Sequence, residues 1–221
     1  MTGIKPTRWD KVYKDFKGKR TSVWKEDPTP FFIEKIPFLE QNNVKNILDA
    51  GCGDGRNLVV FAEAGFNMTG VDSSKEACKK AEIITKPFTK TTILQQNLNE
   101  ITFNNKFDAI ICDYVMVHLE EGEKIIQNFY NALKKDGYLL VEFLSTDDPS
   151  CGTGEEVGKN AFLTNGIFNK FYSQEDAKKI LSSFDILDII KTEHQDPDHV
   201  ADYPRSEKHT HDSIYFVCKK K

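Results

Sequence analysis

Short apolar runs alternate with helix-forming segments along most of the chain. The runs typical of buried strands are 45–50, 66–71, 91–95, 107–112 and 138–143. The segments expected to be helical are 55–64, 73–85 and 120–136. Strands and helices that alternate in this way predict a parallel sheet with helices packed against it.

The pattern changes in the last third of the chain. Residues 145–172 contain four glycines among scattered apolar residues, which predicts an ordered, lid-like excursion over the sheet edge. Ser173 then begins a helix, because serine is a favoured N-cap residue and acidic residues follow it. Two further strands, 184–191 and 213–218, flank a polar loop and predict a closing antiparallel hairpin.

The most informative stretch follows the first strand. Asp49 precedes Gly51, Gly53 and Gly55, which allow the backbone to turn tightly and to approach a ligand. The second strand ends at Asp72, whose carboxylate can accept hydrogen bonds from both hydroxyls of a ribose. A dinucleotide-binding turn spaces its glycines differently and brings a pyrophosphate against the helix N-terminus, where Asp49 would repel it. The pattern therefore indicates a nucleoside ligand with a cationic group.

The segment Leu48–Asn57 resembles the D/E-x-G-x-G-x-G turn of class I S-adenosylmethionine (SAM) dependent methyltransferases. The resemblance implies an α/β fold with a doubly wound, mostly parallel, seven-stranded Rossmann-like sheet of order 3-2-1-4-5-7-6. The last strand is antiparallel and a helical cap precedes the sheet. SAM is the implied cofactor and S-adenosylhomocysteine (SAH) its product. Arg56 and Asn57 after the glycines are typical of the tellurite-resistance (TehB-like) and thiol methyltransferase branch, which the chain looks similar to.

The same resemblance assigns cofactor contacts to the strand ends. Asp49 and the glycine backbone would face the methionine end of SAM, Asp72 the ribose and Ser73 the adenosine. Asn97 stands where many relatives place an aspartate that accepts from the adenine amino group, and its side-chain carbonyl can also accept. The expected cofactor-binding residues are Asp49, Gly51, Cys52, Gly53, Arg56, Asn57, Asp72, Ser73, Asn97, Leu98 and Asp113.

Candidate catalytic residues lie after the fourth strand and around the last hairpin. His118 is either a base near the transferred methyl group or an N-terminal structural contact. Four histidines crowd the final loop and its borders, either as an acceptor-binding edge or as solvated surface, well away from the cofactor. Aromatic residues of the N-terminal segment either cap the cofactor or dock a terminal helix. The candidate catalytic residues are His118, His194 and His211, and the candidate substrate-binding residues are Tyr13, Trp24, Tyr114, Arg205 and His209.

The methyl acceptor is expected to be a small molecule with a soft nucleophile, a thiol or a metalloid. Such an acceptor needs alignment more than a strong base, and no metal-ligand cluster is evident near the strand ends. A metabolite carboxylate or hydroxyl, with His118 or a loop histidine as the base, is the second interpretation. A non-catalytic SAM-binding subunit that recognises a partner protein through 145–172 is the third.

Composition limits the other classes. The 221 residues, 39% of them hydrophobic, predict one methyltransferase domain, with a cap segment at 1–44 and a SAM-binding core at 45–221. A net charge of -4 and dispersed lysines argue against nucleic-acid binding. The sequence contains no apolar signal core and no apolar stretch of membrane length. The five cysteines are expected to be reduced thiols. A cytoplasmic monomer or homodimer is therefore expected.

Overall fold

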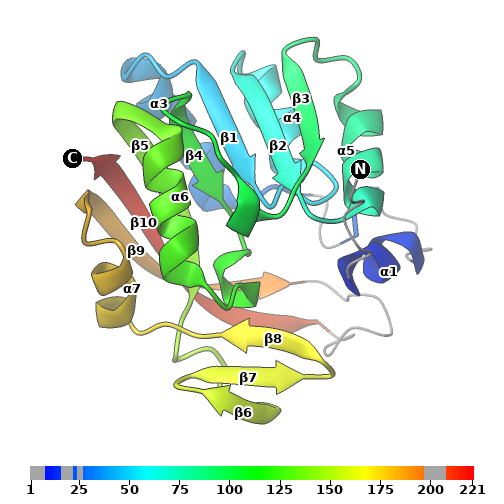
Figure 1. The fold of residues 1–221 in the computed structure, drawn as a ribbon, viewed down its shortest axis with the longest axis vertical. Coiled ribbons are helices and arrows are strands. Elements are labelled where there is room, and N and C mark those ends of the chain that lie inside the picture. The colour runs from blue at the N-terminus through cyan, green and yellow to red at the C-terminus, as the bar shows by residue number, and fades with distance from the viewer. Residues whose placement is uncertain (1–7, 16–21, 24–26, 197–207) are drawn as a thin grey trace.

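A central sheet of seven strands organises the chain in the computed structural model, which describes residues 8–15, 22–23, 27–196 and 208–221 (Figure 1). The strands are β1 (Asn46–Ala50), β2 (Asn67–Asp72), β3 (Thr91–Gln95), β4 (Phe107–Cys112), β5 (Leu133–Leu144), β9 (Phe184–Asp196) and β10 (His209–Lys220). Their order is β3-β2-β1-β4-β5-β10-β9, and β10 runs antiparallel to both of its neighbours. The expected doubly wound, mostly parallel α/β fold and its strand order are confirmed.

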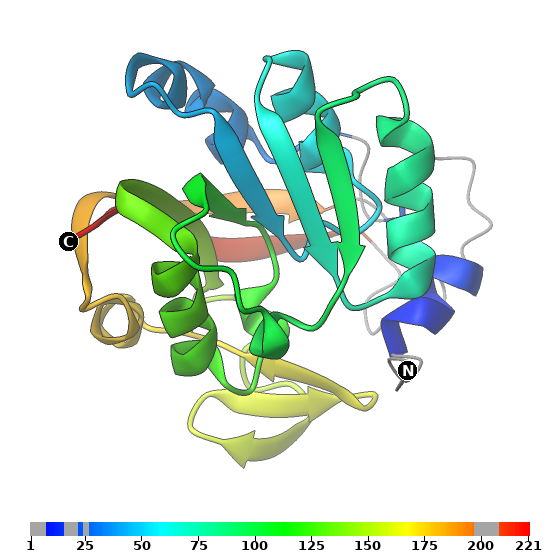
Figure 2. The same ribbon diagram turned by 45° about the horizontal axis from the view of Figure 1, so that its top comes forward.

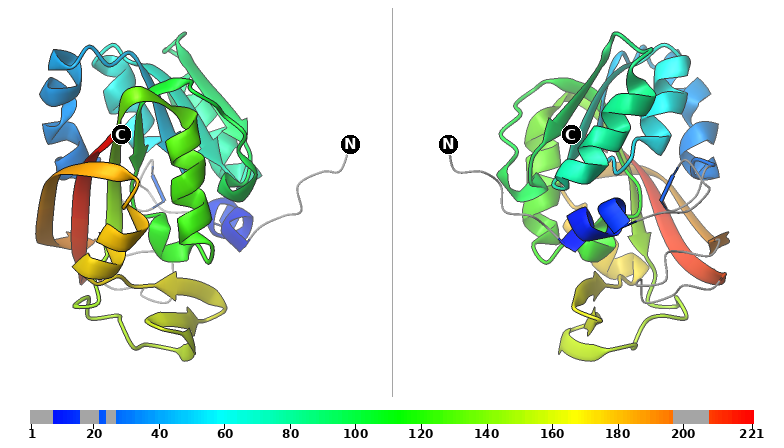
Figure 3. Two further views of the ribbon diagram at one scale, coloured as in Figure 1. Left: turned by 60° about the vertical axis from the view of Figure 1, so that its left-hand side comes forward. Right: turned by 90° about the vertical axis from the view of Figure 1, so that its right-hand side faces the viewer.

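Helices cover both faces of this sheet (Figures 1 and 3). They are α1 (Arg8–Asp15), α2 (Pro30–Glu34), α3 (Ile36–Gln41), α4 (Arg56–Glu63), α5 (Lys75–Thr85), α6 (Gly122–Ala132) and α7 (Gln174–Ile180), with the short 3-10 turns η1 (Leu98–Glu100) and η2 (Met116–His118). Successive strand residues point to opposite faces. In β1, Leu48 and Ala50 belong to the apolar core that includes α6 and α7, whereas Ile47 belongs to the core that includes α2, α4 and α5. The two cores hold the strand ends in place between them.

The strand positions follow the apolar pattern closely, whereas helix starts depend on capping. β3 and β4 have the predicted bounds. α5 begins at Lys75 and not at Ser73, because Ser74 is the N-cap and its hydroxyl accepts from the Ala77 N–H at 3.2 Å. The sequence therefore placed the start of this helix two residues too early.

The strands on one side of the sheet are longer than the sequence predicts. β5 begins at Leu133, where the preceding helix was expected to continue, and β9 extends to Asp196. The pairing of β9 with β10 brings His209 opposite Asp196, and His211 opposite His194. The strand limits expected from the sequence, 184–191 and 213–218, were therefore too short, because the ladder of backbone hydrogen bonds continues past the apolar part of each strand.

Residues 145–172 form an ordered excursion, as expected, with an antiparallel sheet of its own. Its strands are β6 (Glu155–Gly158), β7 (Ala161–Thr164) and β8 (Ile167–Lys170). Figures 1 and 2 show this small sheet beyond the end toward which the arrows of β1 to β3 point. β8 packs against η2, and α1 packs against α5. A Cβ on Gly166 would lie 2.6 Å from Nη1 of Arg8, so the small sheet and the N-terminal helix meet at this end.

The five cysteines form no disulfide, and four of them are buried, as the sequence predicts. Cys151 in the excursion is the partly exposed one. Within the described ranges, no helix combines the length and the apolar character needed to cross a membrane.

Candidate active site

The turn between β1 and α4 has a backbone that glycine adopts at little cost. Gly51, Gly53 and Gly55 have φ angles of 78°, 55° and 94°, all in the left-handed region. A Cβ at Gly51 would lie 2.4 Å from Cγ2 of Val115, and one at Gly53 would lie 2.6 Å from the Tyr13 hydroxyl oxygen. The segment after β4 and helix α1 therefore both approach the turn too closely for a side chain.

A cavity lies over this turn, where open α/β sheets bind their ligands. Its wall draws on distant parts of the chain, from Trp9 in α1 to Asp196 at the end of β9. Trp24 and Arg205, two substrate candidates, and His199 lie outside the described residues. The predicted residues found in the wall are Gly51, Cys52, Gly53, Arg56, Asn57, Asp72, Ser73, Asn97, Leu98 and Asp113 as cofactor candidates, Tyr13 and Tyr114 as substrate candidates, and His118.

Three buried polar atoms beside the turn have no hydrogen-bond partner among the described residues. They are Oδ2 of Asp49, Nη1 of Arg56 and Oδ1 of Asn57. A buried polar atom without a partner is costly, so such a group indicates a ligand. A zwitterionic amino acid would satisfy all three, because its ammonium group donates to the two oxygens and its carboxylate accepts from the guanidinium. The residues present therefore fit the methionine end of SAM.

Asp113 orients two of these side chains. Its Oδ2 accepts from Nη2 of Arg56 at 2.7 Å, from Nδ2 of Asn57 at 3.0 Å and from the Thr29 hydroxyl at 2.8 Å. With one donor nitrogen used in this way, each side chain keeps its other polar atom for a ligand. A direct contact between Asp113 and the cofactor stays a prediction, since this oxygen already has three donors.

Burial raises the pKa of each of the two strand-end carboxyls. The pKa of Asp49 rises to about 8 through desolvation and the neighbouring Asp113 charge, against which Arg56 acts. Desolvation also raises the pKa of Asp72 to about 6, although its carboxylate accepts from the Ser74 N–H at 2.8 Å and the Gly53 N–H at 2.9 Å. A cationic ligand beside Asp49 would favour its charged form.

Asn97 has a structural role that the sequence did not indicate. Its side-chain carbonyl caps η1 by accepting from the Asn99 N–H at 3.0 Å. The expected acceptance from the adenine amino group would need the second lone pair of this oxygen, so that contact remains a prediction.

His118 lines the cavity as a neutral imidazole. Its Nδ1 lies 3.1 Å from the Phe168 carbonyl of β8, which can only accept, so Nδ1 donates. The ring of Trp9 lies 4.7 Å from that of His118. Desolvation lowers the pKa of His118 to about 4 despite this hydrogen bond. Its role as a catalytic base stays a prediction, and at neutral pH the side chain would be a weak base.

Tyr114 connects the cavity to the last hairpin. It has a φ of 58°, a conformation that costs a non-glycine residue about 1–3 kcal/mol. Its N–H donates to Oε2 of Glu142 at 2.6 Å, and its hydroxyl lies 2.8 Å from Nε2 of His211. Backbone strain that is held by specific hydrogen bonds at a cavity wall is typical of a functional residue.

His211 is buried and held on both sides of its ring. Only 4% of the residue is exposed, and Nδ1 lies 2.7 Å from Oδ2 of Asp148 while Nε2 lies 2.9 Å from Nε2 of His209. The solvated-surface interpretation was therefore wrong for His211. His211 adjoins the cavity, because Tyr114 belongs to the cavity wall and contacts His211 directly, and the separation of His211 from the cofactor stays a prediction. His194 lies directly opposite His211 in the pairing of β9 with β10, with its ring 5.8 Å from that of His211.

Sequence reasoning missed two residues of this region, Asp148 and Asp196, whereas Trp9 is one of the N-terminal aromatic residues considered as a cofactor cap. Asp148 is 63 positions from its partner His211, and no spacing motif joins them. The expected absence of a metal-ligand cluster is also not supported, since Asp196, His209 and His211 gather at the hairpin end. The only available signal was the density of histidines near the last strand.

Known proteins provide independent comparisons. The family model described as a methyltransferase domain matches residues 23–186. A ubiquinone biosynthesis O-methyltransferase of Rickettsia typhi is 31% identical over 118 residues, which cover 52% of this chain and 48% of that protein. The chain spans about half the length of the curated relatives it matches.

Solved structures share the fold at low sequence identity. TehB from Haemophilus influenzae aligns with a TM-score of 0.65 at 16% identity, over 85% of this chain and 62% of that chain. The 1,6-didemethyltoxoflavin-N1-methyltransferase of Burkholderia thailandensis, solved with bound 1,6-didemethyltoxoflavin and SAH, aligns with a TM-score of 0.63 at 15% identity. That alignment covers 85% of this chain and 77% of that one.

Proposed function

We propose that this chain, which belongs to the methyltransferase-domain family, transfers a methyl group from SAM to a small-molecule acceptor. The class I SAM-dependent methyltransferase that the glycine turn resembles is confirmed at the level of family and fold. SAM is the methyl donor of this class, and a structural neighbour was solved with its product SAH.

The observation that carries the proposal is the set of unpartnered buried atoms of Asp49, Arg56 and Asn57. Their two acceptors and one donor match the ammonium and carboxylate groups of methionine. A pyrophosphate offers only acceptors, so it would leave Asp49 and Asn57 without partners. The arrangement therefore supports SAM over a dinucleotide.

The acceptor we propose is a thiol, bound in the cavity beside His118 and Tyr114. A thiol must lose its proton before its sulfur attacks the methyl carbon, because the thiolate is the nucleophile. Tyr114, His211 and Asp148 form a hydrogen-bonded chain that leads away from the cavity and supports the removal of such a proton. As the new S–C bond forms, the C–S bond of the sulfonium breaks and its electron pair stays on SAH.

A hydroxyl acceptor is the second candidate. The same Asp148–His211 pair favours it, since an oxygen nucleophile depends on a base more strongly than a thiol does. The Rickettsia typhi relative is named an O-methyltransferase. Metalloid oxyanions such as selenite and tellurite are already negatively charged. Their methylation needs no proton to be removed, so the hydrogen-bonded chain would have no role in it.

A panel assay tests these assignments. The chain is incubated with SAM and with thiols, phenols, carboxylic acids, selenite or tellurite, and SAH release is measured. We expect turnover with thiols to exceed that with the other acceptors. Tyr114→Phe keeps the ring and removes the hydroxyl, and we expect roughly 10²-fold lower turnover on thiols or hydroxyls, with SAM affinity unchanged.

Different failures have different meanings. Binding of SAM without turnover on any acceptor would favour the non-catalytic subunit, and gel filtration with candidate partners would follow. Turnover on tellurite alone, unaffected by Tyr114→Phe, would overturn the thiol assignment and leave methyl transfer in place. Failure to bind SAM would overturn the whole proposal.

A further inference from the structure

The end of the β9–β10 hairpin at which Asp196 pairs with His209 carries polar side chains on one face. Pairing places Asp196 opposite His209, and His194 opposite His211. Because strand residues alternate between faces, His209 and His211 project from the same side of β10. Asp196 also belongs to the cavity wall, so this cluster adjoins the candidate active site.

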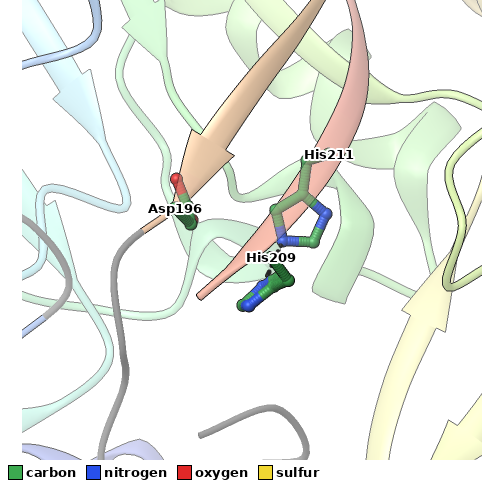
Figure 4. A group of neighbouring side chains, drawn as sticks. All are labelled: Asp196, His209 and His211. Atoms are coloured by element: carbon green, nitrogen blue, oxygen red, sulfur yellow. Dashed lines mark hydrogen bonds between the residues drawn. The ribbon is translucent and has the colours of Figure 1, made fainter. Parts of the chain in front are cut away.

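Three of these residues present potential metal ligands to one another (Figure 4). One ligand atom from each of Asp196, His209 and His211 lies within 4.8 Å of the others. The two Nε2 atoms are 2.9 Å apart. Two nitrogens that bind one ion at about 2.0–2.1 Å and at a right angle have about this separation. A carboxylate oxygen of Asp196 lies within 4.8 Å of both histidine ligand atoms.

The surroundings of His211 orient its ring as they do in metal sites. Asp148 accepts from Nδ1 of His211 at 2.7 Å, from the Asp212 N–H at 3.0 Å and from the Ser150 N–H at 2.7 Å. A carboxylate held in this way fixes Nδ1 as the protonated nitrogen and turns the Nε2 lone pair toward the cluster.

The Nε2 lone pair of His211 has two neighbours within hydrogen-bond distance. Both the Tyr114 hydroxyl, at 2.8 Å, and Nε2 of His209, at 2.9 Å, lie within hydrogen-bond distance of Nε2 of His211. A neutral imidazole nitrogen has a single lone pair, so it accepts well from one donor only. A cation bound by Asp196, His209 and His211 would accept a lone pair from each of them. The two histidine nitrogens would then no longer have to share one hydrogen bond.

We propose that Asp196, His209 and His211 bind a divalent first-row transition-metal ion at the acceptor end of the cavity. Two imidazoles and one carboxylate suit Zn²⁺ or Fe²⁺, whereas Mg²⁺ and Ca²⁺ prefer oxygen ligands. Three protein ligands leave a coordination position for an exogenous molecule.

The position of the site gives the ion a role, which rests on the proposed methyl transfer. With an ion bound, the Nε2 lone pair of His211 would be a metal ligand and could not accept from Tyr114, so the ion would replace the hydrogen-bonded chain in activating the acceptor. An acceptor thiol or hydroxyl that coordinated the ion would lose its proton to water, because the metal would lower its pKa. The bound sulfur or oxygen then attacks the methyl carbon, and the sulfonium C–S bond breaks with its electron pair on SAH. The ion changes neither its charge nor its oxidation state.

Metal binding is measured separately from turnover. The chain, freed of any affinity tag and treated with a chelator, is titrated with Zn²⁺ against a chromogenic chelator and with Co²⁺ by visible absorption. We expect one equivalent of each ion to bind. His209→Ala and Asp196→Asn should each weaken binding at least tenfold, and Asp148→Asn should weaken it about 10–100-fold through the orientation of His211.

Asp212→Asn is the matched control, because it removes a carboxylate from the same strand next to His211 and on the opposite face. This variant should bind Zn²⁺ as the unaltered chain does. Absence of binding, or equal binding by His209→Ala and the unaltered chain, would overturn the metal site while SAM binding left the proposed function intact. Zn²⁺ binding by a chain that does not bind SAM would keep the site and overturn the function.

Discussion

At the scale of single residues, the candidate active site contains three buried polar atoms that no described residue satisfies. Asp49, Arg56 and Asn57 each bury a polar atom that no described residue pairs. Their burial costs stability, and a ligand that pairs with them recovers it. A substitution that removes one of these buried polar atoms should therefore raise the stability of the ligand-free chain and weaken the binding of the ligand.

Asp49→Asn should show this opposition through pH. The folded pKa of about 8 lies above the ordinary value of 3.8, so between these values the folded chain holds a proton that the unfolded chain has lost. The free energy of unfolding of the ligand-free chain therefore falls as pH rises through this window. The asparagine cannot ionise, so the variant should be more stable than the unaltered chain at pH 8, with a smaller difference near pH 5. Urea denaturation at both pH values measures this, and a constant difference would contradict the raised pKa.

The two strand-end carboxylates should differ in how they distinguish SAM from SAH. Asp72→Ala should weaken both ligands alike, by roughly 10–100-fold, because it removes an acceptor for the ribose that they share. Asp49→Asn should weaken SAM more than SAH if its carboxylate also senses the sulfonium charge. Titration calorimetry with both ligands measures the ratio, and Asp72→Asn, which keeps one acceptor oxygen, is the control. Equal losses in Asp49→Asn would confine its role to the amino group.

At the scale of elements, local patterns sufficed where a β-branched or apolar run covers the whole strand. β3 and β4 have the predicted bounds, and Ser173 caps α7 as expected, through the Asp176 N–H. The polar ends of β9 and β10 gave no such signal, because their extension depends on pairing between strands. The small sheet β6–β8 was expected only as an excursion for the same reason.

The candidate site also has one part that the sequence predicts and one part that only the structure shows. The cofactor residues are close in sequence, so one motif places Asp49, Arg56 and Asn57 together. Tyr114 and His211 are 97 positions apart, and only the order of β4, β5 and β10 in the sheet brings them into contact. The order of the strands in the sheet therefore brings together the residues at the acceptor end, and the glycine motif carries no information about that order.

Two glycines of the excursion provide a matched test of its packing. Gly152 has a φ of 89° with no atom near an added Cβ, whereas Gly154 has a φ of 102° and its Cβ would lie 2.6 Å from the Leu163 carbonyl oxygen. Gly152→Ala should cost about 1 kcal/mol from the left-handed backbone alone. Gly154→Ala should cost about 1–3 kcal/mol more, because backbone of β7 must move. Hydrogen exchange and proteolysis within 145–172 measure the difference, and equal effects would show that β7 is not held against this turn.

At the scale of the whole molecule, the cavity joins segments from both ends of the described chain. Trp9 and Tyr13 of α1, the glycine turn and Asp196 of β9 all contribute to one wall. A ligand in this cavity therefore stabilises the arrangement of the N-terminal segment and the last hairpin against the central strands. The organisation of 1–221 as one domain, with a cap at 1–44, remains a prediction that such coupling would support.

Thermal unfolding with bound product tests this coupling and the nature of the ligand together. SAH at 100 times its dissociation constant should raise the free energy of unfolding by about 2.7 kcal/mol, since it binds the folded chain alone. For a chain of this size that corresponds to a rise in Tm of about 5–11 °C. NADH at the same concentration should leave Tm unchanged, because its pyrophosphate cannot pair with Asp49. Asp72→Ala should reduce the SAH shift at the same ligand concentration. A single shifted transition would support one cooperative domain, a second transition unaffected by SAH would contradict it, and stabilisation by NADH without SAH would contradict the SAM site.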